Sequence, residues 1–197
     1  MRFNSHVERL LVSTVALVNE LTPGQDGGRS VGEPAGDELV EAVARAVRTQ
    51  GYSGRTTAAE ARALLAEVRA ARQVIEAVAV DDLPGAAARV NAMLARTRAR
   101  PQLDHDDEGG FRLHFHGPDD SFSRGWAAGL AAGLAMALGG DGGQRLGMCE
   151  APACDRVYVD QSKNSHRRFC GSRCQSRVKA AEHRRRRSSG HASAATS

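Results

Sequence analysis

The chain contains four cysteines, and all of them lie in its last quarter: Cys149 and Cys154 form one close pair, and Cys170 and Cys174 form a second. A loop of fifteen residues separates the pairs. Two close pairs joined by one loop can bring four thiolates to the corners of a tetrahedron, which is the geometry of structural Zn²⁺ sites. The pattern therefore predicts one zinc ion with a structural role, because four protein ligands leave no position open for water or substrate.

Four histidines offer alternative sites. His166 and His183 lie near the cysteines and could serve as ligands, but four thiolates already complete a zinc site. His114 and His116 would share one face of a strand over 111–116, where they could form a second metal site or a catalytic pair. We favour the simpler interpretation that this face meets solvent or a helix while the apolar residues of the strand face the core. The sequence shows no phosphate-binding loop, nucleophile elbow or paired carboxylates, so we expect no enzyme.

The second cysteine pair leads into a strongly basic segment. Residues 156–187 carry eleven Lys and Arg side chains against two acidic ones, whereas the rest of the chain has a net charge of −5. A mildly acidic body with a basic end suggests that this end meets a polyanion. The candidate nucleic-acid contacts are the basic and polar residues around and beyond the second pair: Arg167, Arg168, Arg173, Gln175, Ser176, Arg177, Lys179, Arg184, Arg185, Arg186 and Arg187.

The members of this basic segment could act in different ways. Arg184–Arg187 would cover all sides of a helix, which suits neutralisation of phosphates better than base reading. Gln175, Ser176 and Arg177 are residue types that can bond to base edges. Arg177 could instead support the zinc site, and the whole run could be no more than a solvated end of the chain.

Helices are expected to build the rest of the molecule, because Ala, Leu and Val dominate and aromatic residues make up only 4%. Five segments have apolar residues at helical spacing: 5–21, 37–49, 57–79, 82–98 and 121–138. In the last of these, Gly125, Gly129 and Gly133 share one face, so that another backbone could approach it closely. The segment 22–36 has the Gly and Pro content of an exposed loop. The predicted fold class is mainly α with a few short strands (α+β).

The cysteine region itself predicts a compact module. Cys149 and Cys154 would form a tight knuckle, and an apolar strand, a polar turn and a returning segment would follow over 155–169. Cys170 and Cys174 are one helical turn apart, so both can point at one metal from the start of the basic helix. Knuckle, hairpin and helix in this order are typical of a treble-clef-like zinc finger, and the neighbouring arginines would offset the charge of its thiolates.

Residues 145–187 resemble the CGNR-type zinc finger of bacterial proteins. The matching elements are the knuckle, the VDQSKN stretch at 159–164, the RRFC approach to Cys170 and an arginine three residues beyond Cys174. The Cys-Gly-Asn-Arg motif that names this family reads Cys-Gln-Ser-Arg here, so the Cys and Arg are kept while the Gly and Asn are replaced. The replacement removes any role that the Asn side chain has in the family and leaves the metal site intact.

The N-terminal part resembles the stress-related ABATE domain that usually precedes such fingers. LVNEL at 17–21 is similar to the F-V-N-T-L motif of that domain, and VNAMLAR at 90–96 and RLHFH at 112–116 also look like parts of it. The resemblance implies a transcription regulator that binds DNA.

We therefore expect a mainly helical ABATE-like domain over 1–143, a CGNR-type zinc finger with a basic helix over 144–187 and a disordered tail over 188–197. The expected function is a zinc-binding regulator that contacts duplex DNA, with the N-terminal domain sensing a small-molecule effector or directing assembly. The alternative is a ligand- or protein-binding domain whose zinc is purely structural. The sequence predicts no secretory signal, and we expect the longest apolar run, Trp126–Leu138, to be too short to span a bilayer. We expect a cytoplasmic protein, where thiols stay reduced and bind metal.

Overall fold

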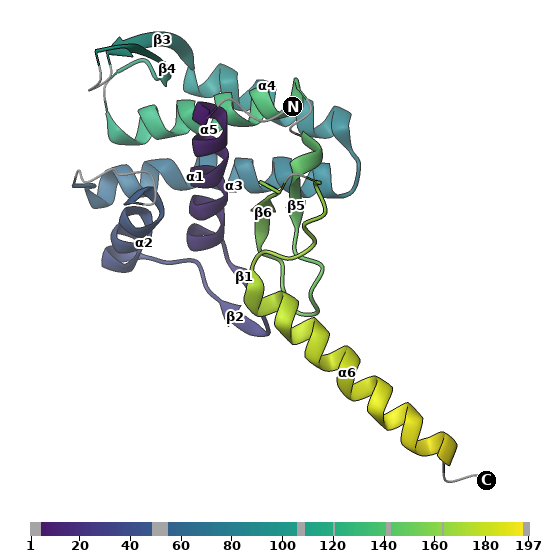
Figure 1. Cartoon of the computed structure of the whole chain (residues 1–197). Helices are drawn as coiled ribbons and strands as arrows, with labels where there is room; N and C mark the ends of the chain where they lie inside the picture. Colours follow the sequence, from purple (N-terminus) through teal and green to yellow (C-terminus); the bar gives the residue numbers. More distant parts are fainter. Residues whose placement is uncertain are drawn as a thin grey trace.

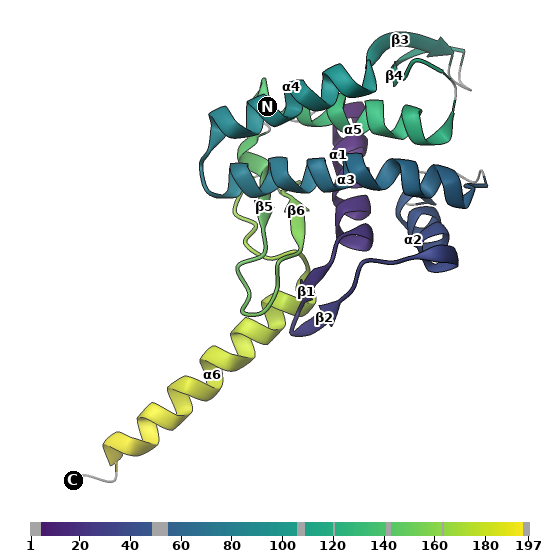
Figure 2. The same ribbon diagram turned by 180° about the vertical axis from the view of Figure 1, so that it is seen from behind.

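The computed structural model describes residues 5–48, 55–105, 109–119, 121–140, 143–162 and 164–194. Helices α1 to α5 form a compact body, and helix α6 projects from one corner of it (Figures 1 and 2). The helices are α1 (Ser5–Leu21), α2 (Gly36–Arg48), α3 (Ala58–Ala79), α4 (Leu83–Thr97), α5 (Phe122–Leu138), the short 3₁₀ helix η1 (Gly143–Arg145) and α6 (Ser172–Ala194). The strands are β1 (Gly24–Asp26), β2 (Arg29–Val31), β3 (Arg100–His105), β4 (Phe111–His116), β5 (Leu146–Met148) and β6 (Val157–Val159). The predicted fold class, mainly α with short strands, is confirmed.

Local sequence signals explain where the body helices begin. Thr57 accepts a hydrogen bond from the Glu60 N–H at 3.2 Å, and the Glu60 carboxylate accepts one from the Thr57 N–H at 2.9 Å, which completes a capping box before α3. Asp82 caps α4 by accepting from the Gly85 N–H at 2.9 Å, with Pro84 in the first turn. These caps satisfy N–H groups that have no partner within the helix.

Helices α1, α3, α4 and α5 enclose most of the apolar core, in which Leu11, Leu64 and Leu134 are fully buried. The expected close approach of a backbone to the glycine face of α5 is found at Gly133, whereas Gly129 meets only the end of a side chain. A Cβ atom at Gly133 would lie 2.9 Å from Leu10 of α1, and one at Gly129 would lie 3.3 Å from the same residue, while Gly125 faces open space. Small residues therefore let α1 and α5 cross closely.

Two hairpins extend the body. The segment 22–36, expected to be a plain loop, contains the antiparallel pair β1–β2. Strand β4 was expected, but its partner β3 was not, because Pro101 and the acidic turn obscure the pattern. Phe111, Leu113 and Phe115 of β4 were expected to face the core, and this is wrong: Phe111 is 62% exposed, and the other two are half-buried and outside the apolar core of the described residues.

The third hairpin joins the cysteine region to the body. Strand β6 was expected to pair with the segment that follows it, but it pairs antiparallel with β5, which precedes the first cysteine. Leu146, Val157 and Val159 from this hairpin belong to the same core cluster as α1 and α3. Both sides of the boundary expected at 143 thus share one core, and a division into two independent domains stays a prediction.

Helix α6 is longer than expected. The segment 188–197, for which a disordered tail was expected, continues as helix as far as Ala194, and residues 195–197 lie outside the described part. None of the helices in the described residues is long and apolar enough to cross a membrane.

Val157→Ala tests whether the hairpin is part of the main core. Val157 is fully buried, so loss of two methyl groups should lower the free energy of unfolding of the whole chain by about 2 kcal/mol. Chemical denaturation followed by circular dichroism measures this change. The matched control is Val80→Ala at a position that is 76% exposed, where the change should be below ~0.5 kcal/mol. An unchanged helical transition in Val157→Ala would show that the body folds independently of the hairpin.

Candidate metal centre and nucleic-acid interface

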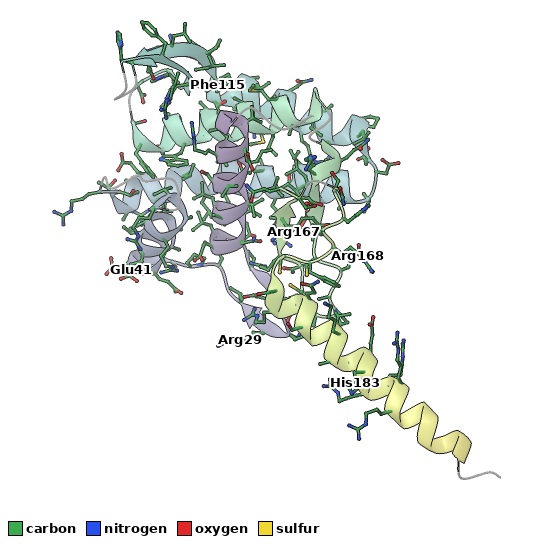
Figure 3. All side chains as sticks on the ribbon, viewed as in Figure 1. Arg29, Glu41, Phe115, Arg167, Arg168 and His183 are labelled. Atoms are coloured by element: carbon green, nitrogen blue, oxygen red, sulfur yellow. The ribbon has the colours of Figure 1, made fainter. Side chains whose placement is uncertain are left out.

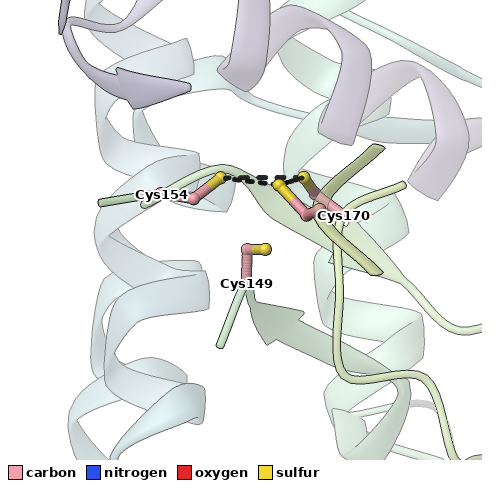
Figure 4. Close-up of side chains that lie close together, drawn as sticks. Cys149, Cys154 and Cys170 are labelled. Atoms are coloured by element: carbon pink, nitrogen blue, oxygen red, sulfur yellow. Dashed lines mark hydrogen bonds between the residues drawn. The ribbon is translucent and has the colours of Figure 1, made fainter. Parts of the chain in front are cut away.

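The four cysteine sulfurs form one cluster. Cys149 and Cys154 lie in the turn between β5 and β6, whereas Cys170 lies just before α6 and Cys174 in its first turn. Figure 4 shows the side chains of Cys149, Cys154 and Cys170 close together. The Sγ atoms of Cys154, Cys170 and Cys174 lie 3.6 to 3.7 Å apart, and the sulfur of Cys149 completes a group within 4.8 Å. Sulfurs at 2.3 Å from a tetrahedral Zn²⁺ lie ~3.8 Å from one another. The cluster therefore fits one structural zinc ion, as the cysteine spacing predicted.

Backbone hydrogen bonds hold the two cysteine pairs in place. The Cys149 N–H donates to the Arg156 carbonyl at 2.9 Å, which closes the knuckle, and the Glu150 N–H donates to the Arg168 carbonyl at 2.9 Å. The second of these bonds ties the knuckle to the segment that leads into Cys170. Backbone geometry thus brings the two cysteine pairs together, in addition to what a bound metal would contribute.

The sulfurs have unequal environments. Burial, followed by hydrogen bonds and charge repulsion among the sulfurs, raises the pKa of the Cys170 thiol. Burial also raises the pKa of the Cys174 thiol. At Cys154 burial acts in the same direction, but N–H groups of Arg156 and Gly27 donate to the sulfur and lower the pKa overall. A divalent cation supplies the positive charge that lets all four sites ionise together.

Arg167 and Arg168, both candidate nucleic-acid contacts, lie beside the metal site rather than along the projecting helix (Figure 3). The Arg167 guanidinium lies 5.3 Å from the ring centre of Tyr158 and donates to the carbonyls of Phe169 and Cys170. Arg168 forms an ion pair with Glu150 of the knuckle. Both side chains therefore brace the finger internally.

Arg173 and Arg177 also have partners within the protein. Arg173 pairs with Asp26 of β1, and Arg177 donates to the Pro152 carbonyl at 3.2 Å and approaches the Cys174 sulfur at 3.9 Å. The position of Arg177 favours its alternative role as a support for the zinc site. Base reading by Arg177 stays a prediction, without geometric support.

The other candidates lie on the exposed surface of α6. Seven residues share this exposure: Gln175, Ser176, Lys179, Arg184, Arg185, Arg186 and Arg187. His183 also lies on the projecting part of the helix, away from the sulfurs (Figure 3). Within the described residues the metal cluster consists of the four cysteines alone, so neither His183 nor His166 joins it.

A buried polar network attaches the finger to α1, and no motif in the sequence indicated it. Asn19 in the middle of an apolar pattern donates to the Val157 carbonyl and accepts from the Val157 N–H, both at 2.9 Å. Arg156, whose side chain is only 5% exposed, donates to the carbonyls of Asn19, Thr22 and Pro23. An isolated Asn on an apolar helix face was the one available signal of this network in the sequence.

His114 and His116 share one face of β4, as expected, and meet an acidic partner. The Nε2 atom of His116 lies 2.6 Å from the Asp104 carboxylate on β3, and the Nδ1 atom of His114 lies 4.0 Å from it. These three residues do not meet the geometry of a metal-binding group among the described residues.

Zinc content provides a direct test of the site. Purified protein should hold about one zinc ion per chain, and Cys170→Ser should lose it, because three thiolates remain. Zinc retention should fall as pH falls, since protons compete with the metal for the thiolates. Elemental analysis after gel filtration at several pH values measures both effects. The matched control is His183→Ala, which should keep its zinc; loss of metal from that variant would contradict the four-cysteine site.

The comparisons with known protein families agree with this architecture. Residues 145–187 match the CGNR zinc finger. Residues 7–141 match the ABATE family, described as "putative stress-induced transcription regulator". Among curated proteins, none matches the chain. Since the second match spans more than half of its length, the chain belongs to the ABATE family, and a CGNR zinc finger follows the ABATE region.

Proposed function

We propose that the protein is a transcription regulator whose helix α6 binds duplex DNA through its phosphates. The observation that carries this proposal is the direction of α6, which leaves the body just beyond the zinc site and exposes every residue from Lys179 to Arg187 (Figure 2). This stretch has five basic residues against one acidic residue, Glu182. A helix that projects with such a charge can approach a duplex without interference from the acidic body.

The dimensions of the projecting part suit this partner. Residues 179–194 of a continuous helix span ~24 Å, and the major groove of DNA, about 12 Å wide, admits a single helix. An open groove of about 550 Å³ runs between Pro152 and one side of α6, where Arg184 and Arg185 line it. Basic side chains on more than one face of the helix support contacts to phosphates on both sides of a DNA groove.

The zinc module then holds the start of this helix in a fixed position. Cys170 and Cys174 fix its first turns, while Arg167 and Arg168 brace the surrounding loops. We propose a treble-clef-type finger, a cytoplasmic location and no enzymatic activity. The ABATE region would sense an effector or assemble with partners. In the second candidate function the zinc is only structural and the body binds a ligand or protein; the internal partners of four candidate arginines favour it.

Neutralising Arg184–Arg187 tests the proposal. Replacing all four with Gln should weaken binding to random and genomic duplexes alike, because phosphates carry no sequence information. The slope of log K against log salt should become less steep by ~0.9 for each lost contact. Fluorescence anisotropy over a salt series measures both quantities.

A matched control removes the same charge from the body, with Gln at four exposed arginines: Arg9, Arg48, Arg62 and Arg89. This control should keep the salt slope of the unchanged protein. Equal losses in the two variants would show that only net charge matters. Binding that is absent or insensitive to salt in the unchanged protein would favour the second candidate function.

A further inference from the structure

The β1–β2 hairpin of the ABATE region lies directly against the zinc knuckle, although more than a hundred residues separate them in sequence (Figures 1 and 2). The Gly28 N–H donates to the Ala153 carbonyl at 2.7 Å. The Asp155 N–H donates to the Gln25 carbonyl at 2.9 Å, and the Gln25 N–H donates to the Asp155 carboxylate at 2.9 Å. Both chain neighbours of Cys154 are therefore held by the hairpin.

The turn of this hairpin also packs against the residue that precedes a zinc ligand. A Cβ atom at Gly27 would lie 2.9 Å from the guanidinium of Arg173, next to Cys174. Gly27 and Gly28 have φ values of 59° and 91°, which favour glycine and allow the turn to approach the finger closely. Groups that hold the residues around a metal ligand orient it and contribute to metal retention. The ABATE region thus supplies part of the surroundings of the metal site.

The same hairpin holds the start of α6. Arg173, which immediately precedes the ligand Cys174, donates to the carboxylate of Asp26 and to its carbonyl at 3.2 Å. The hairpin therefore reaches both halves of the site, Cys154 in the first pair and the helical turn that carries Cys174. Solvent or a binding partner can reach this ion pair, because the side chains of Arg173 and Asp26 are 53% and 38% exposed.

We propose that the Gly24–Val31 hairpin is a positioning element of the zinc site, through which the ABATE region controls zinc retention and the direction of α6. The hairpin connects α1 to α2, so a ligand or partner that shifts either helix would move it. Release of the hairpin removes the Gln25, Gly28 and Asp26 contacts together. The chain neighbours of Cys154 then lose their bonds to the hairpin, and the first turn of α6 loses its anchor on the body.

The coupling must act in both directions, because linkage between two binding events is reciprocal. If the hairpin stabilises bound zinc, then bound zinc stabilises the closed hairpin. Removal of zinc should therefore speed amide hydrogen exchange in residues 24–31 as well as in the knuckle. Exchange in α4, which is remote from the hairpin, serves as the internal reference.

Zinc release from the full-length protein tests the proposal without nucleic acid, so its failure is distinguishable from failure of the proposed DNA binding. Zinc-loaded protein is mixed with an excess of chromophoric chelator, and the release rate is followed by absorbance. Asp26→Asn and Gly27→Ala should release zinc roughly 10-fold faster. Glu41→Gln, on the exposed face of α2, and Gly32→Ala, which faces open space, are the matched controls and should match the unchanged protein.

A charge exchange separates positioning from general destabilisation. Asp26→Arg and Arg173→Asp should each speed release, and the two combined should restore a slow rate because the ion pair can re-form with reversed polarity. The test remains informative even if a single variant folds poorly, because the double variant is still expected to release zinc slowly. The proposal is overturned if Asp26→Asn and Gly27→Ala release zinc at the unchanged rate, if the double variant shows no rescue, or if zinc removal leaves exchange in 24–31 unaltered.

Discussion

Arg156 is buried between the end of α1 and the zinc knuckle, and each of its five N–H donors needs an acceptor there. The structure provides five bonds: one each from the guanidinium to the carbonyls of Asn19, Thr22 and Pro23, and two to the Asp155 carboxylate. The carbonyls at the end of α1 also carry the negative end of the helix dipole, which stabilises a cation. This one side chain fixes the knuckle on the body, and the positions of the hairpin, the metal site and α6 follow from it.

The network around Arg156 has a second member in Arg72 of α3. Arg72 donates to the Thr22 hydroxyl, and its guanidinium lies 3.5 Å from the Asp155 carboxylate. The Asp155 carboxylate therefore forms ion pairs with two arginines, Arg72 and Arg156, and also accepts a hydrogen bond from the Gln25 N–H. Burial acts to raise the pKa of Asp155, but the Arg156 bond and the other contacts lower it overall. The carboxylate next to Cys154 thus stays ionised, and the polar core of this junction is satisfied rather than strained.

The arginines of the C-terminal region divide into two groups by position. Those from Arg167 to Arg177 have partners within the protein: they pair with Glu150 and Asp26, donate to peptide carbonyls and approach the Cys174 sulfur. Positive charge close to the sulfurs offsets the local negative charge of a tetrathiolate site. Those from Arg184 onward extend beyond the body on an exposed helix. The metal site and the charged end of α6 belong to one continuous element, because α6 begins at Ser172, between the ligands Cys170 and Cys174. The position of the metal site therefore sets the direction of the charged helix.

The sequence by itself determined the metal ligands, the body helices and their caps, because these depend on spacing and on contacts within a few residues. Thr57 with Glu60, Asp82 with Gly85, and the two cysteine pairs all belong to this class. The pairing of β6 with β5, the β1–β2 hairpin and its bonds to the chain neighbours of Cys154 were decided only by the tertiary structure. The physical reason is that an arginine, a glycine or a short apolar run has the same local pattern whatever partner it meets. Arg173 and Arg184 look alike in the sequence, and only the fold brings Asp26 to one and leaves the other at the exposed surface.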